Sequence, residues 1–265
     1  MSLWDKLIGK PQPPQSSPSA SCASPAQVLY EKGMRLLEAG QKREALHAWV
    51  DAVEADPRCI DACIMLARSF HQIDPVEYGE LMLKYAEQAY EIDPSNSRAA
   101  NIASVARFAR GKTHWDHEEW QDAYECFKLS LIYDPENQQP FAALEYHSKR
   151  ANQRIDFADF CERLLRTSPG HNERNYALGR ACLDIAISIS DTPTLGPIRS
   201  EWLTKGRAAL SEYLRGSPEC PDGWYAFGHT CNLMKDKDAA TKACATLAGL
   251  DPDRAQELSY AVLEF

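Results

Sequence analysis

The chain lacks the features that usually indicate chemistry or a membrane. No stretch approaches the roughly 20 consecutive apolar residues that a membrane-spanning helix needs. The sequence holds no Cys-x-x-Cys pair, no phosphate-binding glycine loop, no nucleophile elbow and no metalloprotease helix motif. We therefore expect a protein that is not an enzyme, with no cofactor, no catalytic residue and no metal site.

Positive charge is also scarce. The 29 lysines and arginines are outnumbered by 38 aspartates and glutamates, and the formal net charge is −9. Nucleic acids and anionic membranes require a basic field for broad binding, so neither is an expected partner. A local basic strip remains compatible with this balance.

Cysteine, in contrast, is present nine times. The count is odd, and several thiols occupy positions where a helix buries small apolar residues, as free cysteine commonly does. This favours a reducing compartment over a disulfide framework. The first ten residues lack the apolar core of a secretory signal, because Asp5 interrupts them. The expected location is the cytoplasm.

The most informative feature of the sequence is a recurring proline, usually preceded by aspartate. Six prolines follow one another at spacings of 34 to 49 residues: Pro57, Pro94, Pro135, Pro169, Pro218 and Pro252. Proline cannot continue a helix, and an adjacent Asp or Ser can cap the next one. A period near 34 residues, lengthened by insertions, predicts stacked helical hairpins.

The first and last hairpins show the pattern best. Small residues let two helices approach closely, and large apolar residues fill the gap to the neighbouring hairpin. In the first hairpin these residues are Leu29, Gly33, Leu36, Ala45, Trp49, Ala52 and Pro57; in the last they are Trp224, Phe227, Gly228, Ala240, Cys244, Leu247 and Pro252. In this arrangement the chain closely resembles the tetratricopeptide repeat (TPR) family.

The resemblance covers residues 26–254 and about six repeats. It implies an all-α fold, a right-handed superhelix of antiparallel helix pairs whose concave groove binds peptides or partner helices. The register of the third repeat is unsettled, because its pattern puts Arg107 and Arg110 at apolar positions. The fifth repeat carries an insertion near Ser188–Ser200, and residues 255–265 suit a short capping helix.

Two segments precede the repeats. Residues 11–25 are rich in Pro, Ser and Gln and are expected to form a linker. Residues 1–10 place four large apolar residues on one helical face: Leu3, Trp4, Leu7 and Ile8. Such a segment docks on a partner, on this protein's own groove or, less readily, on a membrane through residues 3–8; otherwise it is a tail with incidental hydrophobic residues.

The resemblance also implies which residues line the groove, because in this family the first helix of each repeat faces the concave side. The expected partner-binding residues are Tyr30, Met34, Ile64, Arg68, His71, Lys112, Trp115, Tyr146, Lys149, Arg150, Tyr176, Arg180, Tyr225 and His229. The central positions carry aromatic residues and cations but no carboxylate. Arginine and tyrosine are enriched in binding hot spots, although an ordinary solvated helix face has the same residue types.

These residues predict a non-enzymatic scaffold or adaptor that holds a peptide or helix of another protein. Arg and Lys would pair with the carboxylates of an acidic segment. The chaperone that one family subset clamps is not expected, because Tyr30 and Met34 stand where that clamp has Lys and Asn. The alternative is a regulatory sensor for a small ligand or signalling peptide, with the insertion near residues 188–200 as its lid.

His114 and His117 have a spacing compatible with metal, since residues three apart can share a helix face. No third and fourth ligand are apparent beside them. We expect both histidines to be structural.

Overall fold

The structure is a computed structural model that describes residues 24–149 and 151–263. Within these ranges it contains thirteen α-helices and no strand. The chain divides into two compact units, Met1–Ala62 and Cys63–Phe265. The predicted segment 1–10 and all but the last two residues of the predicted linker lie outside the described residues.

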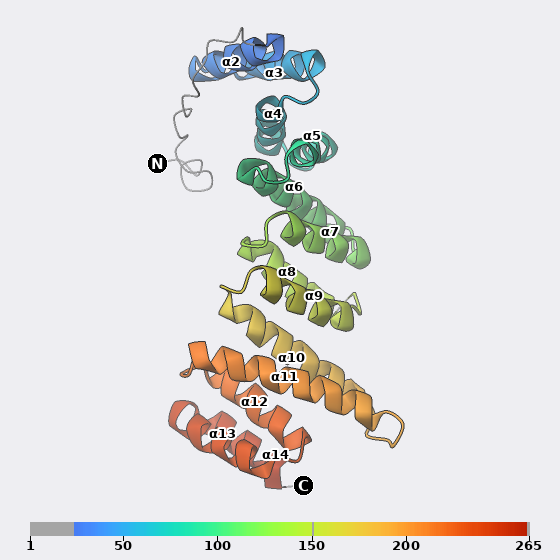
Figure 1. The fold of residues 1–265 in the computed structure, drawn as a ribbon, viewed down its shortest axis with the longest axis vertical. Helices are drawn as coiled ribbons and strands as arrows, with labels where there is room; N and C mark the ends of the chain where they lie inside the picture. Colours follow the sequence, from blue (N-terminus) through green and yellow to red (C-terminus); the bar gives the residue numbers. More distant parts are fainter. Residues whose placement is uncertain (1–23, 150, 264–265) are drawn as a thin grey trace. The chain divides into compact units, whose positions relative to one another are not determined.

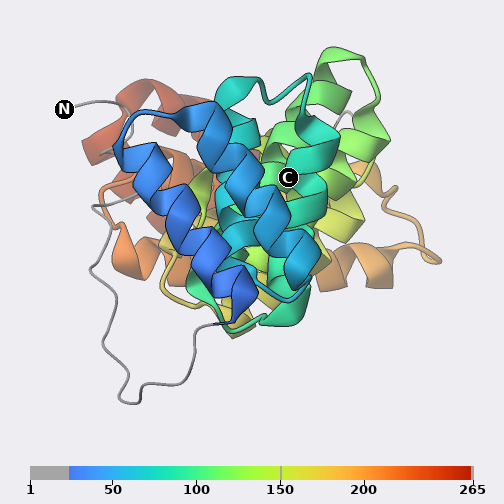
Figure 2. The ribbon, with the colours of Figure 1, turned by 90° about the horizontal axis from the view of Figure 1, so that it is seen from above.

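The helices follow one another as consecutive packed pairs, closed by a single final helix (Figure 1). Their bounds are α2 Pro25–Glu38, α3 Lys42–Ala55, α4 Ile60–Ile73, α5 Gly79–Ile92, α6 Ser97–Asp116, α7 Trp120–Tyr133, α8 Gln138–Ser148, α9 Arg154–Thr167, α10 Asn172–Ser188, α11 Gly196–Gly216, α12 Pro221–Leu233, α13 Lys237–Leu250 and α14 Pro252–Leu263. In the first unit, α2 and α3 lie side by side in both views (Figures 1 and 2). This confirms the predicted all-α arrangement of helical hairpins.

Glycines set the close approach within the pairs. In the first unit, a Cβ atom added at Gly33 would overlap the indole of Trp49. In the second unit, a Cβ at Gly111 would lie 2.6 Å from Cε1 of Phe127, and one at Gly179 would lie 2.5 Å from Cγ of Leu210. These contacts leave no room for a side chain, because buried residues are packed at crystal-like density.

Aspartates explain where several pairs end. Asp56, Asp93, Asp134 and Asp251 each follow the last residue of a helix in extended conformation, as the residue before proline prefers. Their carboxylates accept hydrogen bonds from backbone N–H groups two or three residues later, at distances from 2.9 to 3.2 Å. The recurrent Asp-Pro thus both stops one helix and shapes the turn into the next.

The third repeat owes its unusual pattern to ion pairs. Gly111 of α6 packs on Phe127 of α7, which fixes the register of this pair. The Nε of Arg107 donates to Glu87 of α5 at 2.6 Å, and Arg110 is ion-paired with Glu80 of the same helix. The two arginines stand at positions where the repeat pattern expects apolar residues because they tie α6 to the preceding pair.

The predicted insertion lengthens helices rather than forming a long loop. Helix α10 continues to Ser188 and α11 begins at Gly196 with 21 residues, so only residues 189–195 connect them. This connection projects beyond the neighbouring helices of the second unit in both views (Figures 1 and 2). At the other end of this unit, α14 packs on α12 and α13.

Candidate functional site

The expected partner-binding residues lie on, or directly after, the first helices of the pairs. Tyr30 and Met34 belong to α2 in the first unit; the others belong to the second unit. Ile64 is only 1% exposed, so its side chain has almost no surface to offer a partner. Arg150 lies outside the described residues.

Two of the expected partner-binding residues, on α6 and α8, are in aromatic contact. The ring centroids of Trp115 and Tyr146 are 6.1 Å apart with the rings near perpendicular, a favourable arrangement. Tyr146 is 61% exposed, which is unusual for a large aromatic residue in this structure. Lys112 of α6 is also exposed.

The structure places three of the expected residues, Lys149, Tyr176 and Arg180, in one cavity of about 180 Å³. The cavity lies where α8, α9 and α10 meet. Its other lining residues are Glu145, Ser148, Arg154, Phe157, Ala177, Ala181 and Asp184. We call these ten residues the α8–α10 pocket.

Charges of both signs line the α8–α10 pocket. Lys149 Nζ lies 3.1 Å from a carboxylate oxygen of Asp184. Arg154, in contrast, has its Nε atom buried with no hydrogen-bond partner. Arg180 likewise has no ion pair or hydrogen bond within the described part of the chain. Two guanidinium groups therefore line one cavity without a carboxylate of their own.

Burial and charge shift the pKa values around this pocket. Burial raises the pKa of the Glu145 carboxyl, although the positive charges of Lys149 and Arg180 oppose that shift. Burial lowers the pKa of His229 on α12, and the charge of Arg180 lowers it further. The field of Arg180 thus reaches the next pair of helices, where the rings of Tyr225 and His229 are stacked with centroids 6.3 Å apart.

The sequence reasoning missed two residues of this pocket. Glu145 is a half-buried carboxylate beside positions that were expected to carry none, and Arg154 comes from the first turn of α9, a second helix of its pair. Helical spacing could have found Glu145, because Lys149 follows it by four residues on the same face. Spacing could not have found Arg154, because only packing brings α9 against α10.

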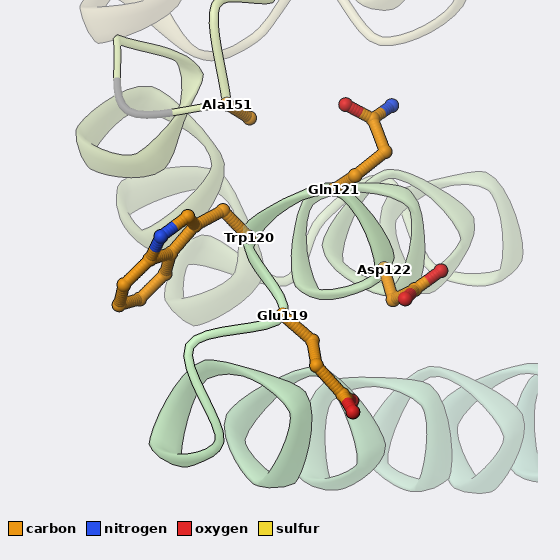
Figure 3. A pocket seen from close by; sticks show the side chains of 5 residues that line it. All are labelled: Glu119, Trp120, Gln121, Asp122 and Ala151. Carbon is orange, nitrogen blue, oxygen red and sulfur yellow. The ribbon is translucent and has the colours of Figure 1, made fainter.

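A second, shallower hollow lies at the start of α7. Glu119, Trp120, Gln121, Asp122 and Ala151 line it (Figure 3). Its volume is about 380 Å³. Its charged lining residues are both carboxylates, so it has the opposite character to the α8–α10 pocket.

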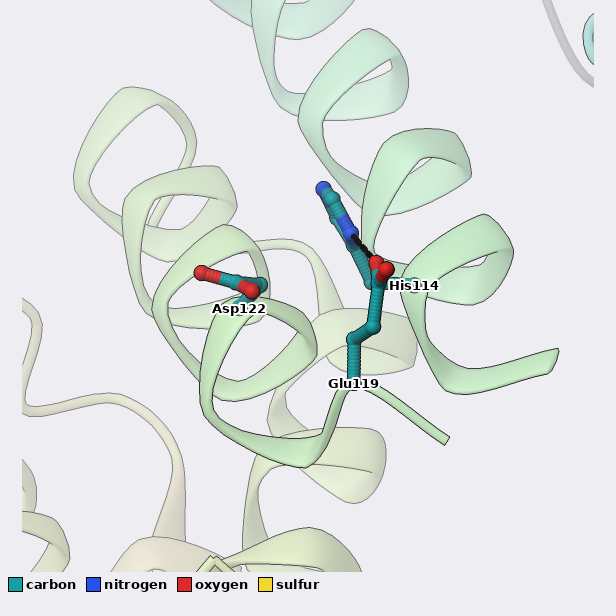
Figure 4. A group of neighbouring side chains, drawn as sticks. All are labelled: His114, Glu119 and Asp122. Carbon is teal, nitrogen blue, oxygen red and sulfur yellow. Dashed lines mark hydrogen bonds and ion pairs between the residues drawn. The ribbon is translucent and has the colours of Figure 1, made fainter. Parts of the chain in front are cut away.

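His114 connects this hollow to α6. Potential ligand atoms of His114, Glu119 and Asp122 lie within 4.8 Å of one another, close enough to share a cation (Figure 4). The histidine is held by hydrogen bonds, since its Nδ1 pairs with Glu119 and its Nε2 accepts from Nε of Arg110 at 3.0 Å. The hydrogen bond from His114 lowers the pKa of the Glu119 carboxyl. Hydrogen bonding thus accounts for how His114 and Glu119 are placed.

Comparison with known proteins gives likenesses of fold only. No protein-family model matches the chain, and no curated protein does either. Among solved structures, YrrB, described as a TPR protein with an unusual peptide-binding site, is 17% identical; the match covers 80% of this chain and 98% of YrrB with a TM-score of 0.48. PilF of Pseudomonas aeruginosa is 18% identical over 89% of this chain and 96% of its own, with a TM-score of 0.40.

No helix in the described part of the chain is long and apolar enough to cross a membrane. The arrangement of the chain's own helices indicates its fold class. Their consecutive packed pairs, with glycines where the helices cross, are consistent with a TPR protein, as the sequence pattern predicted.

Proposed function

We propose that this protein is a scaffold or adaptor that holds a segment of another protein on the first helices of its second unit. The observation that carries the proposal is the α8–α10 pocket, which gathers Lys149, Tyr176 and Arg180 from separate helices. Cations and aromatic rings that converge on one cavity are typical of binding hot spots. A cytoplasmic location and the absence of enzymatic activity remain predictions.

The aromatic pairs extend the surface on either side of the pocket along the chain of packed helices. Trp115 and Tyr146 precede it on α6 and α8, and Tyr225 and His229 follow it on α12. A partner segment that crosses these helices would contact apolar rings at both ends and charges in the middle. We do not propose the sensor alternative, because residues 196–200 of the expected lid belong to α11 and only residues 189–195 connect the two helices.

Charge reversal tests the proposal. In the triple variant Arg68→Glu, Lys149→Glu and Arg180→Glu, we expect partner capture from a lysate to be abolished, because three attractive charges become repulsive. The matched control reverses three cations on second helices: Arg166→Glu, Arg215→Glu and Lys242→Glu. These are exposed, and among the described residues Arg166 and Arg215 are each ion-paired only within their own helix.

Quantitative mass spectrometry of the captured proteins gives the result. The proposal predicts that the control retains the partners of the wild type and the triple variant loses them. If the triple variant retains them at wild-type affinity, the first helices do not form the binding surface.

A further inference from the structure

We propose that the α8–α10 pocket is a carboxylate site, which seats one Asp or Glu side chain of the bound segment. This inference rests on the proposed function and specifies how the partner is anchored. The carboxylate lies between the guanidinium groups of Arg154 and Arg180. Tyr146 and Tyr225 contact the flanking residues of the same segment.

The pairing of arginines elsewhere in the second unit is the first argument. Five half-buried arginines there are ion-paired with a carboxylate of the chain: Arg107 with Glu87, Arg110 with Glu80, Arg199 with Asp191, Arg207 with Asp236 and Arg254 with Asp222. Arg154 and Arg180 depart from this pattern, although both line a cavity beside two carboxylates. The buried Nε of Arg154 has no hydrogen-bond partner within the described residues, and neither has that of Arg174. Arg154 and Arg180 differ from Arg174 in that both line a cavity.

The shape of the guanidinium group also favours a carboxylate. A guanidinium group presents its N–H donors as a planar fork that matches the two oxygens of a carboxylate. Lys149 Nζ lies 3.1 Å from Asp184, so its charge is already partly compensated within the chain, whereas Arg154 and Arg180 have no ion pair among the described residues. Phe157, Ala177 and Ala181 form the apolar part of the lining.

Charge separates a carboxylate from a phosphate. Among the described lining residues, Lys149, Arg154 and Arg180 give three formal positive charges against two negative charges from Glu145 and Asp184, a net charge of one. A single carboxylate neutralises that charge. A phosphate dianion would exceed it and would lie beside both acids, which disfavours phosphate.

Arginine side-chain NMR on the full-length protein tests the site without a known partner. The probe is sodium propionate, titrated at constant ionic strength while the Nε–Hε resonances of Arg154 and Arg180 are followed. We expect both resonances to shift and saturate with propionate and to remain unchanged with propionamide, which has the same shape but no charge. The variants Arg154→Gln and Arg180→Gln assign the two signals.

Affinity changes in variants sharpen the test. Arg154→Gln should weaken propionate binding about tenfold, because it removes a charge-assisted hydrogen bond. Glu145→Gln should strengthen it several-fold, because it removes a negative charge from the lining. This gain keeps the proposal testable even if Arg154→Gln fails to fold. Arg166 and Arg215, which are 75% and 73% exposed, report general screening by the anion.

Three results would overturn the carboxylate site. The first is equal shifts at Arg166 and Arg215, which would indicate binding to any arginine. The second is inorganic phosphate binding more tightly than propionate, which would assign the pocket to phosphate. The third is no shift at Arg154 or Arg180 at any propionate concentration.

Failure of the carboxylate site can be told apart from failure of the proposed function. Tyr225→Ala removes a ring on α12 outside the pocket and tests partner capture by itself. Capture that needs Tyr225 but tolerates Arg154→Gln and Arg180→Gln would refute the carboxylate site and leave the scaffold standing. Propionate binding without any capture that depends on Tyr225 or the pocket would refute the scaffold instead.

Discussion

The two hollows of the second unit differ in whether their charged side chains have a partner within the chain. At the start of α7, Glu119 is bonded by His114, and Arg110 is ion-paired with Glu80. In the α8–α10 pocket, Arg154 and Arg180 have no such carboxylate within the described residues. The pKa of Glu119 is lowered by its hydrogen bond, whereas that of Glu145 is raised by burial.

The difference separates a region where charged side chains join neighbouring helices from one where two arginines have no carboxylate partner among the described residues. Around α6, arginines use their charge to join one helix pair to the next. Around α10, the same residue type is left with unused donors in a cavity. The sequence does not distinguish an arginine that is ion-paired within the chain from one that is not. The distinction depends on whether a carboxylate of the chain lies beside it.

The largest expected effect concerns the crossing of α10 and α11, beside the α8–α10 pocket. Gly179→Ala should lower the free energy of unfolding by about 1–3 kcal/mol, because the new methyl group would lie 2.5 Å from Cγ of the buried Leu210. Gly249→Ala is the control, since no heavy atom lies within 4 Å of its Cβ position. It should raise stability by up to about 1 kcal/mol through helix propensity. Urea unfolding measures both, and an unchanged Gly179→Ala variant would contradict the close crossing.

The next effect contrasts a paired and an unpaired arginine. Glu87→Gln should lower the free energy of unfolding by about 1–3 kcal/mol, because it leaves Arg107 and the hydroxyl of Tyr133 without their charged acceptor. Arg180→Gln should change it by less than about 0.5 kcal/mol, because no bond is lost. Urea unfolding of the two variants gives the comparison. Equal losses would mean that Arg180 is bonded in solution and that the two regions do not differ.

A smaller effect appears in the pH dependence of stability. Burial gives Glu145 a higher pKa in the folded than in the unfolded chain, where a glutamate has a value of about 4.3. The stabilisation linked to its protonation is complete below the unfolded value and is lost as pH rises through the folded value. Glu145→Gln should remove this decline. The difference in unfolding free energy between wild type and variant, measured from pH 4 upward, should therefore change with pH; a flat difference would contradict burial of the carboxyl.

The smallest effect concerns Glu119, which is exposed. His114→Ala should return the pKa of the Glu119 carboxyl towards its ordinary value, because the hydrogen bond that lowers it is lost. Carbon-detected NMR titration of the glutamate side chain measures the shift. His117→Ala, on a residue with no hydrogen bond to Glu119, is the control and should have the lesser effect. A larger effect from His117→Ala would mean that a different histidine holds this hollow together.

Much of the fold followed from local rules that the sequence states directly. Recurring Asp-Pro pairs predicted the ends of helix pairs because proline stops a helix and aspartate accepts hydrogen bonds from the next turn. Small residues such as Gly33 predicted a close approach of two helices, and the structure places the ring of Trp49 against Gly33. The register of the third repeat could not be predicted, since Arg107 and Arg110 occupy apolar positions for the sake of carboxylates on α5.

The sequence by itself therefore determined the helix pairs and the residue types on the first helices, because both depend on spacing along the chain. Only the tertiary structure decided which of those residues meet. It buried Ile64, gathered Lys149, Tyr176 and Arg180, and added Glu145 and Arg154 to them. Whether a cation is paired depends on neighbours far along the chain, and their distance is fixed by packing between helices rather than by the spacing of residues within one.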